Sequence, residues 1–531
     1  MERPASHPAS LAAPLPIGGA ACEALAVVAL VPLLAALAAS ARAEALGSAG
    51  WGWAAGGGWS LMGRTVGLAA GAATIALAAA WVLTGAAVRL PDGAGRVAVV
   101  LACLPLLIPS TLLATAWIAA LGRQGVLARP LARWLGVRVN VYSPSVAAAA
   151  MAMRYFGIAA IVLMRRRLWQ RGTVAAERVF GIRPAAILWT RLRGAAPAAA
   201  AAWLLVAAFA MGDHVLPDML EVPTYGTQML ILVQARLDAP AAAALAAPMA
   251  AVAMAMLLAA AVLLRRQRPP DQQAAGAILP RPGLRQVLPA GAIAVAVLGA
   301  ALAGPVIGLL WRAGSARALL EAWDGAKEEV SRTAVLAATA GCTATAIGAV
   351  LAGRWLRRVR ARRISAVPVV LLNLAAAPML LAIGTIDLTQ RWPLWAIRDT
   401  NGPLLIAYVT RLVPVATLVL FAAWRGGDDG PVLAARVHGV GRWRTAWRVV
   451  WPARRAGLLA AALLTGLLAA TELEASVLLA APGRGTLGVR LQSMIHTAPA
   501  WMFSALAVDV LLLAAPCMVA LTILATRSAR R

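Results

Sequence analysis

The sequence predicts an all-α, polytopic membrane protein with about twelve transmembrane helices, arranged as two parallel six-helix repeats. Three observations predict this fold class: the composition, a succession of long apolar segments and an internal repeat. Of the 531 residues, 61% are hydrophobic and only 13% are charged, with a mean hydropathy of +0.78. Soluble domains are roughly 45–50% apolar and roughly 25% charged, so the composition excludes an ordinary soluble core and intrinsic disorder.

A transmembrane helix needs about 20 predominantly apolar residues. The segments that meet this requirement are 25–41, 66–88, 97–121, 146–164, 195–211, 241–264, 287–310, 333–352, 364–383, 404–424, 456–470 and 500–526. The first segment also fits a signal peptide, because residues 39–43 resemble a cleavage site. Retention as a span and cleavage both stay open.

The arginines follow alternate connections between these segments. The net charge is +28, and Lys327 is the only lysine. The basic connections hold Arg165–Arg167, Arg191, Arg193, Arg265, Arg266, Arg268, the arginines of 354–363, Arg442, Arg444, Arg448, Arg454, Arg455, Arg527, Arg530 and Arg531. Cytoplasmic loops carry such an excess. We therefore expect both termini in the cytoplasm, the lipid bilayer as partner and no nucleic-acid partner.

One connection disagrees with this topology. Arg123, Arg129, Arg133 and Arg138 are predicted to lie on the outer side, where the other loops carry mostly acidic residues.

The internal repeat joins four pairs of segments in the same order. Residues 154–163 match 411–420, and 175–181 match 433–439. Asp213 pairs with Glu472, and Gly226-Thr227 pairs with Gly485-Thr486, the offset drifting only from 257 to 259. Six spans in each copy give both copies the same orientation, as in parallel-repeat transporters. The expected organisation is a first repeat at 1–264, a cytoplasmic linker at 265–286 and a second repeat at 287–531.

The connection between the fourth and fifth span of each repeat carries a shared motif. The first copy is Ala175, Ala176, Glu177, three residues and Gly181; the second is Leu433, Ala434, Ala435, three residues and Gly439, with Val-Val-Trp-Pro ending at Pro452. Small alanines allow a helix to approach a partner closely. The glycine is expected to end that helix in the left-handed conformation, and the proline to turn the chain back into the bilayer.

This pattern resembles the EAA loop of permeases of binding-protein-dependent ABC importers, roughly E-A-A-x-x-x-G, nine residues and I-x-L-P. The family's glutamate is Ala175 in one copy and Leu433 in the other, and the first copy ends in Gly194 instead of proline. Residues 471–491, with 213–230 as counterpart, are similar to fused permeases of the ferric-iron type. Fusion of both halves in one chain is also found in thiamine importers.

The resemblance implies a transport subunit without enzymatic activity of its own. The sequence contains no G-x-x-x-x-G-K-[ST] phosphate loop, so a separate ATPase must supply the energy. The implied partners are two copies of a cytoplasmic ABC ATPase, docked on the two alanine–glycine loops, and a periplasmic substrate-binding protein. No cofactor and no metal site are expected.

Several alternatives remain open from the sequence. Asp213 and Glu472 are candidates for the pathway or a gate, although capping or pairing with arginine is the more ordinary role of such acids. His214 and His496 are expected as solvated loop residues, with metal ligation as the alternative. A major-facilitator-type secondary transporter also has six-plus-six parallel repeats, and a non-transporting assembly factor is a third class. The substrate itself cannot be read from the sequence.

Overall fold

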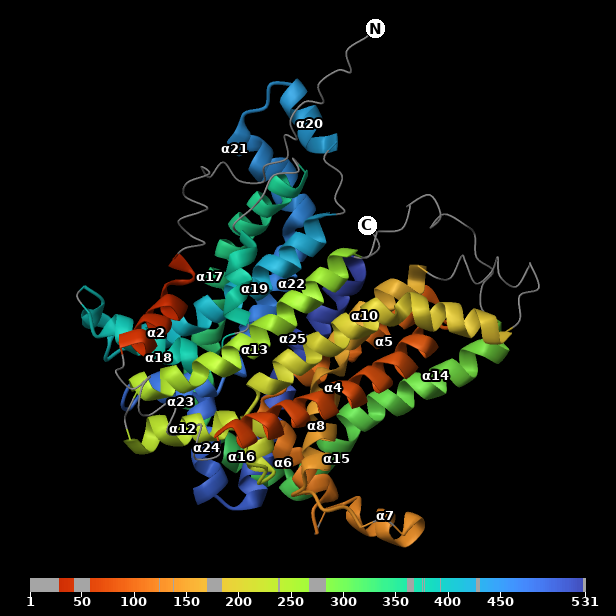
Figure 1. Cartoon of the computed structure of the whole chain (residues 1–531), viewed down its shortest axis with the longest axis vertical. Helices are drawn as coiled ribbons and strands as arrows, with labels where there is room; N and C mark the ends of the chain where they lie inside the picture. The colour runs from red at the N-terminus through yellow and green to blue at the C-terminus, as the bar shows by residue number, and fades with distance from the viewer. Residues whose placement is uncertain are drawn as a thin grey trace. The chain divides into compact units, whose positions relative to one another are not determined.

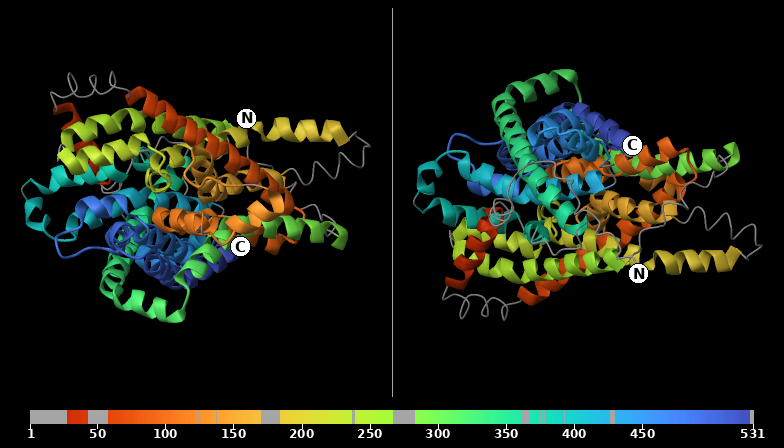
Figure 2. Two further views of the ribbon diagram at one scale, coloured as in Figure 1. Left: turned by 90° about the horizontal axis from the view of Figure 1, so that it is seen from below. Right: turned by 90° about the horizontal axis from the view of Figure 1, so that it is seen from above.

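The computed structural model describes residues 28–42, 58–123, 125–136, 138–169, 184–236, 239–266, 283–360, 367–374, 376, 378–391, 393–425 and 430–528. Every regular element in these ranges is a helix, which confirms the all-α prediction for this part of the chain (Figures 1 and 2).

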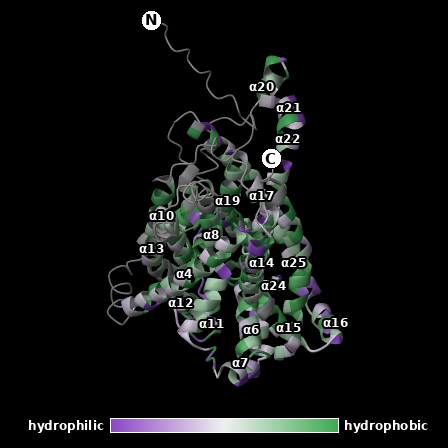
Figure 3. Cartoon of the chain, turned by 90° about the vertical axis from the view of Figure 1, so that its right-hand side faces the viewer, coloured by the Kyte–Doolittle hydropathy of each residue, from purple (hydrophilic) through white to green (hydrophobic). Residues whose placement is uncertain are grey.

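Nine helices in the described residues are long and apolar enough to cross a membrane. They are α4 (Trp59–Ala87), α8 (Pro144–Trp169), α10 (Pro184–Gly212), α13 (Ala239–Arg266), α14 (Leu284–Leu298) with the π-helical η4 (Gly299–Ala303), α17 (Lys327–Arg360), α19 (Gly402–Arg425), α22 (Trp451–Ala470) with the π-helical η7 (Ala446–Val450), and α25 (Ala500–Ser528). Hydrophobic residues, green in Figure 3, predominate along these helices. The chain is therefore a multi-pass membrane protein.

A tenth span results if a bent pair of helices is counted as one. This pair consists of α5 (Asp92–Leu101) with η2 (Leu104–Leu107) and of α6 (Ser110–Leu121), and its two arms meet at 99°. The bend falls on Ile108 and Pro109, and Ile108 is extended, with φ −89° and ψ 130°. A residue before proline avoids the helical conformation, so the sequence itself places the break.

The remaining two predicted spans are shorter than expected. Segment 25–41 contains α2 (Val31–Arg42), and segment 364–383 falls on η5 (Val367–Leu374) and α18 (Pro378–Thr389). Both α2 and α18 have only twelve residues. Twelve spans therefore remain a prediction, while nine or ten are present in the described ranges.

Shorter helices connect the long ones. They are α7 (Ala128–Leu135), α11 (Val215–Met219), α12 (Tyr225–Arg236), α15 (Gly304–Ala313), α16 (Ala316–Asp324), η6 (Leu394–Ile397), α20 (Gly430–Val437), α21 (Arg442–Thr445), α23 (Glu474–Leu479) and α24 (Leu487–Thr497).

The chain forms two compact units, and the boundaries of these units differ from those of the predicted repeats. The first unit takes the described residues of 1–39, 328–489 and 516–531, and the second takes those of 40–327 and 490–515. The predicted repeats are defined by similar sequence, whereas the two units are defined by which residues pack together. A repeat therefore contributes residues to both units.

In each unit a helix from the segment predicted to open one repeat packs on the segment predicted as the third span of the other. In the first unit Asn373 donates a hydrogen bond of 2.6 Å to the carbonyl of Ala29, which precedes α2. Gly384 of α18 lies so close to the backbone of Pro32 that a Cβ atom at this position would overlap the Pro32 carbonyl. In the second unit, Gly308 of α15 lies against Ala116 and Ala120 of α6. Backbones approach this closely only where a helix has no Cβ at the crossing.

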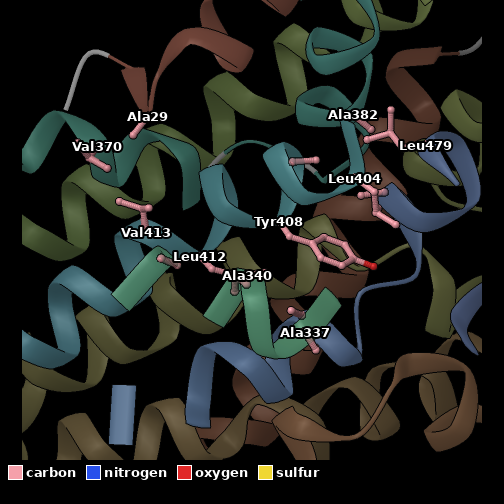
Figure 4. Packing of buried hydrophobic residues seen from close by; sticks show 14 of the residues in the cluster. Ala29, Ala337, Ala340, Val370, Ala382, Leu404, Tyr408, Leu412, Val413 and Leu479 are labelled. Atoms are coloured by element: carbon pink, nitrogen blue, oxygen red, sulfur yellow. The ribbon is translucent and has the colours of Figure 1, made fainter. Parts of the chain in front are cut away.

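The core of the first unit consists largely of alanine and leucine. Ala337 and Ala340 of α17, Tyr408 and Leu412 of α19 and Ala382 of α18 pack together there (Figure 4). Small side chains drive helix association in membranes because they permit close van der Waals packing.

Candidate functional site

In the second unit, the predicted gate residue Asp213 lies at the corner between α10 and α11. Arg154 of α8 approaches it, with 3.4 Å between Nε and Oδ2, and both side chains are at least 90% buried. Tyr155 and Ser110 donate hydrogen bonds to the same oxygen at 3.0 and 3.1 Å. The amide of Leu216 donates to Oδ1 at 3.3 Å. A buried carboxylate needs such compensation, because it has lost its hydration.

This network also holds the bent pair in place. Arg154 donates a hydrogen bond to the carbonyl of Ile108, the extended residue at the 99° break. Ser110, the first residue of α6, reaches Asp213 directly. One acid therefore ties α8, the bend and the α10–α11 corner together.

In the first unit, Glu472 occupies the corresponding corner between α22 and α23. Arg411 of α19 is its partner, with 3.1 Å between Nε and Oε2. Tyr408 and Ser476 donate hydrogen bonds to the carbonyl oxygen of Glu472 at 3.3 and 2.6 Å. The Arg411 side chain is 32% exposed, compared with 10% for Arg154. The second ion pair is thus closer to solvent than the first.

The two ion pairs join residues that the repeat had already aligned. Arg154 corresponds to Arg411, and Asp213 corresponds to Glu472. The sequence placed each arginine and each acid separately, and the structure brings them together in both copies. The residues that the predicted repeat aligns therefore have a similar local geometry in the two units.

A further contact occurs in both units. The amide of Tyr225, which opens α12, donates to Oγ1 of Thr65 at 2.9 Å. The amide of Leu487, which opens α24, donates to Oγ1 of Thr333 at 2.8 Å. These two helix starts lie 262 residues apart, whereas the predicted pairing of Gly226-Thr227 with Gly485-Thr486 has an offset of 259.

The first copy of the alanine–glycine motif lies outside the described residues. This concerns Ala175, Ala176, Glu177 and Gly181.

The second copy of this motif forms α20 and the turn that follows. Ala434 is exposed and Ala435 half-buried. Gly439 has φ +71°, and the amide of Val440 donates to the carbonyl of Ala435 at 2.9 Å. This hydrogen bond and a left-handed glycine define a Schellman cap. The expected end of the helix at Gly439 is confirmed.

Pro452 does not turn the chain, contrary to the expectation from its position. Residues 442–470 form one helical run through α21, η7 and α22, with Pro452 at the start of α22. Proline lacks an amide hydrogen, and its ring clashes with the carbonyl four residues earlier, here Arg448. The π-helical turn η7 falls on these residues and widens the helix there. The break in the helical backbone occurs earlier, at residues 438–441.

The two histidines differ from each other. His214 is only 5% exposed and packs against Gly226, so its expected place in a solvated loop is wrong. His496 is exposed near the end of α24, as expected. Among the described residues, no three potential ligands gather as a metal site would require.

Asp509 is a polar residue that the sequence analysis missed. It lies within the span of α25, and its Oδ2 atom is buried without a hydrogen-bond partner in the described part of the chain. A lone acid in an apolar run was the available signal.

Comparison with known protein families gives no match. No curated protein matches the chain either.

Proposed function

We propose that this protein is the membrane permease subunit of an ABC importer. It would move a small solute, such as ferric iron or thiamine, across a bacterial inner membrane. A periplasmic binding protein would deliver the solute and two copies of a separate cytoplasmic ATPase would drive transport. The observation that carries the proposal is the helix α20, which contains Ala434 and Ala435 and is ended by Gly439 in the left-handed conformation.

The geometry of α20 supports a docking role. Val437 is 84% exposed and Leu433 is 44% exposed, although both are apolar. Apolar side chains exposed next to small alanines are typical of a surface that a partner covers. The Schellman cap fixes where this short helix ends, so movement of a docked partner would pass to α21 and α22 through a defined turn.

The corner networks supply the second half of the mechanism. Arg154–Asp213 and Arg411–Glu472 lie at the ends of the fifth span of each repeat, at the predicted outer side. Displacement of the helix that follows each docking loop would reach these corners along one rigid span. A nucleotide-driven change at the loops would in this way shift the population of inward- and outward-open states.

The proposal is tested with Gly439→Trp in the purified complex with a candidate ATPase. A side chain at φ +71° is strained, so the turn after α20 would change while the spans stay intact. ATP hydrolysis should lose its stimulation by the loaded binding protein, and uptake should fall. Gly441→Trp is the matched control, because Gly441 has open space around it and no positive φ. Unimpaired uptake in the Gly439 variant would contradict the docking role.

Asp509 favours a second candidate, a secondary transporter of the major-facilitator type. An acidic side chain within a span, with one buried and unpartnered oxygen, suits proton coupling. Uptake into vesicles driven by a proton gradient, without any ATPase, would support this candidate. Under the ABC proposal, the same vesicles show no uptake and Asp509→Asn retains ATP-driven transport.

A further inference from the structure

A surface of alternating arginine and tryptophan covers the first turns of the helical run 442–470. Trp447 is 62% exposed, Trp451 is 50% exposed, and their rings lie 5.6 Å apart. Arg444, Arg448 and Arg455 are also exposed. Arg444 and Arg448 lie four positions apart, as do Trp447, Trp451 and Arg455, and this interval stays on one side of the α-helix and of the wider π-helical turn η7, so the five residues form one surface. We call it the arginine–tryptophan face.

The arginines of this face have no acidic partner within the described residues. The ion pairs in the described part of the chain involve other arginines, such as Arg317 with Glu321 and Arg398 with Asp399. Three neighbouring positive charges without a carboxylate create a field that attracts an anion. The face therefore calls for a negatively charged occupant that also has apolar surface for the two indoles.

The position of this face, near the end of the spans, matches the headgroup region of a bilayer. Arg454 lies over the ring of Trp424 at 4.9 Å, and Trp424 is the penultimate residue of the neighbouring span α19. Tryptophan is enriched where spans leave the hydrocarbon layer. From Arg455 to Arg448 a helix rises about 10 Å, comparable with the headgroup region.

Towards the C-terminal end of α22, the same face continues as an apolar surface that would contact lipid. Leu459 lies one turn below Arg455 and is 54% exposed within an otherwise apolar span. An exposed leucine at membrane depth contacts acyl chains. The stripe thus runs from acyl-chain contact at Leu459, through Arg455 and Trp451, to Arg448 and Arg444. That continuity favours a lipid over a soluble protein as occupant.

We propose that the arginine–tryptophan face binds an anionic phospholipid. Its phosphodiester would contact Arg444 and Arg448, and the part of an acyl chain nearest the glycerol would contact the indoles of Trp447 and Trp451. Such binding would hold the run 442–470 at a fixed depth in the membrane. It would also position the turn at Gly439, three residues before α21. The site does not depend on the chain being a permease.

The test uses the full chain reconstituted in phosphatidylcholine vesicles that contain a minor fraction of brominated lipid, and it measures quenching of tryptophan fluorescence. Brominated phosphatidylglycerol should quench more than brominated phosphatidylcholine. Arg444→Gln with Arg448→Gln should weaken this preference about thirtyfold, because each of the two arginines contributes about 1 kcal/mol near an anionic surface. Trp447→Phe with Trp451→Phe should remove the excess quenching, since the reporters are lost.

Arg317→Gln with Arg398→Gln is the matched control, because it removes the same charge from exposed arginines elsewhere. It should keep the preference for phosphatidylglycerol. Equal quenching by both lipids in the native protein would overturn the proposal. So would an Arg444/Arg448 variant that keeps the full preference but fails to bind the ATPase in detergent, because the face would then belong to a protein partner.

Discussion

Two arginine–acid pairs repeat the same local chemistry in different surroundings. Asp213 is enclosed by donors from α6, α8 and α11, whereas Arg411 beside Glu472 remains 32% exposed. Removing one member of a buried pair leaves the other charge uncompensated, which costs far more than removing a screened pair. The two copies should therefore respond differently to the same substitution.

Asp213→Asn should destabilise the second unit by roughly 3–5 kcal/mol, because Arg154 would remain buried without its counterion. Glu472→Gln should cost about 1 kcal/mol or less, since its partner Arg411 can turn towards solvent. Thermal unfolding in detergent, followed by circular dichroism, measures both. Equal losses in the two variants would contradict the difference in burial.

The double variant Arg154→Met with Asp213→Asn is the control for this comparison. It removes the uncompensated charge together with its partner, so it should recover part of the stability that Asp213→Asn alone loses. A double variant less stable than the single one would show that the hydrogen bond of Arg154 to Ile108 matters more than the charge.

At the scale of elements, glycine decides where helices cross. A Cβ added at Gly308 of α15 would lie 2.8 Å from the amide nitrogen of Ala120 and 2.9 Å from the carbonyl oxygen of Ala116. Gly291 of α14 has no atom within 4 Å of the same added carbon. A side chain at Gly308 would therefore clash with α6, whereas a side chain at Gly291 would have free space.

Gly308→Ala should destabilise the protein by roughly 1–3 kcal/mol, because α15 must move away from α6. Gly291→Ala should stabilise it by roughly 0.5–1 kcal/mol, because alanine loses less backbone entropy in a helix. The midpoint of thermal unfolding in detergent should move in opposite directions. Shifts of the same sign would mean that the α15–α6 crossing is looser than the structure has it.

The elements also differ in how far the sequence could predict them. The end of α20 followed from Gly439, and the break before α6 follows from proline chemistry at Pro109. The course of the chain at Pro452 did not follow, because a π-helical turn absorbs that proline within the helix. Local rules state what a residue disfavours, and several backbone geometries can satisfy the same rule.

At the scale of the whole molecule, the number of crossings determines which loops share a side of the membrane. Arg317 of α16 and His438 after α20 are separated by α17, by η5 with α18, and by α19. If η5 with α18 crosses as one bent span, three crossings place the two residues on opposite sides. If that segment enters and leaves on one face, they share a side.

Single cysteines at Arg317 and His438, in a chain whose four native cysteines are replaced by alanine, should therefore label from opposite sides. The predicted topology places Arg317→Cys outside and His438→Cys in the cytoplasm. A membrane-impermeant maleimide applied to intact cells should react with the first and not the second until the cells are opened. Reaction of both in intact cells would reduce the count of spans and overturn the assignment of α20 to the cytoplasm.

The sequence by itself determined the membrane class, the helical composition and the left-handed cap of α20. Each of these depends on composition or on neighbours within a few residues. The tertiary structure alone decided that Arg154 meets Asp213 and Arg411 meets Glu472, that Thr65 and Thr333 hold equivalent helix starts, and that opening helices pack on the other repeat's third span. These contacts join residues far apart in the chain, and many registers of alanine-rich helices would satisfy the same hydropathy. Close packing at a few glycines and the pairing of Asp213 and Glu472 with arginines select one of them.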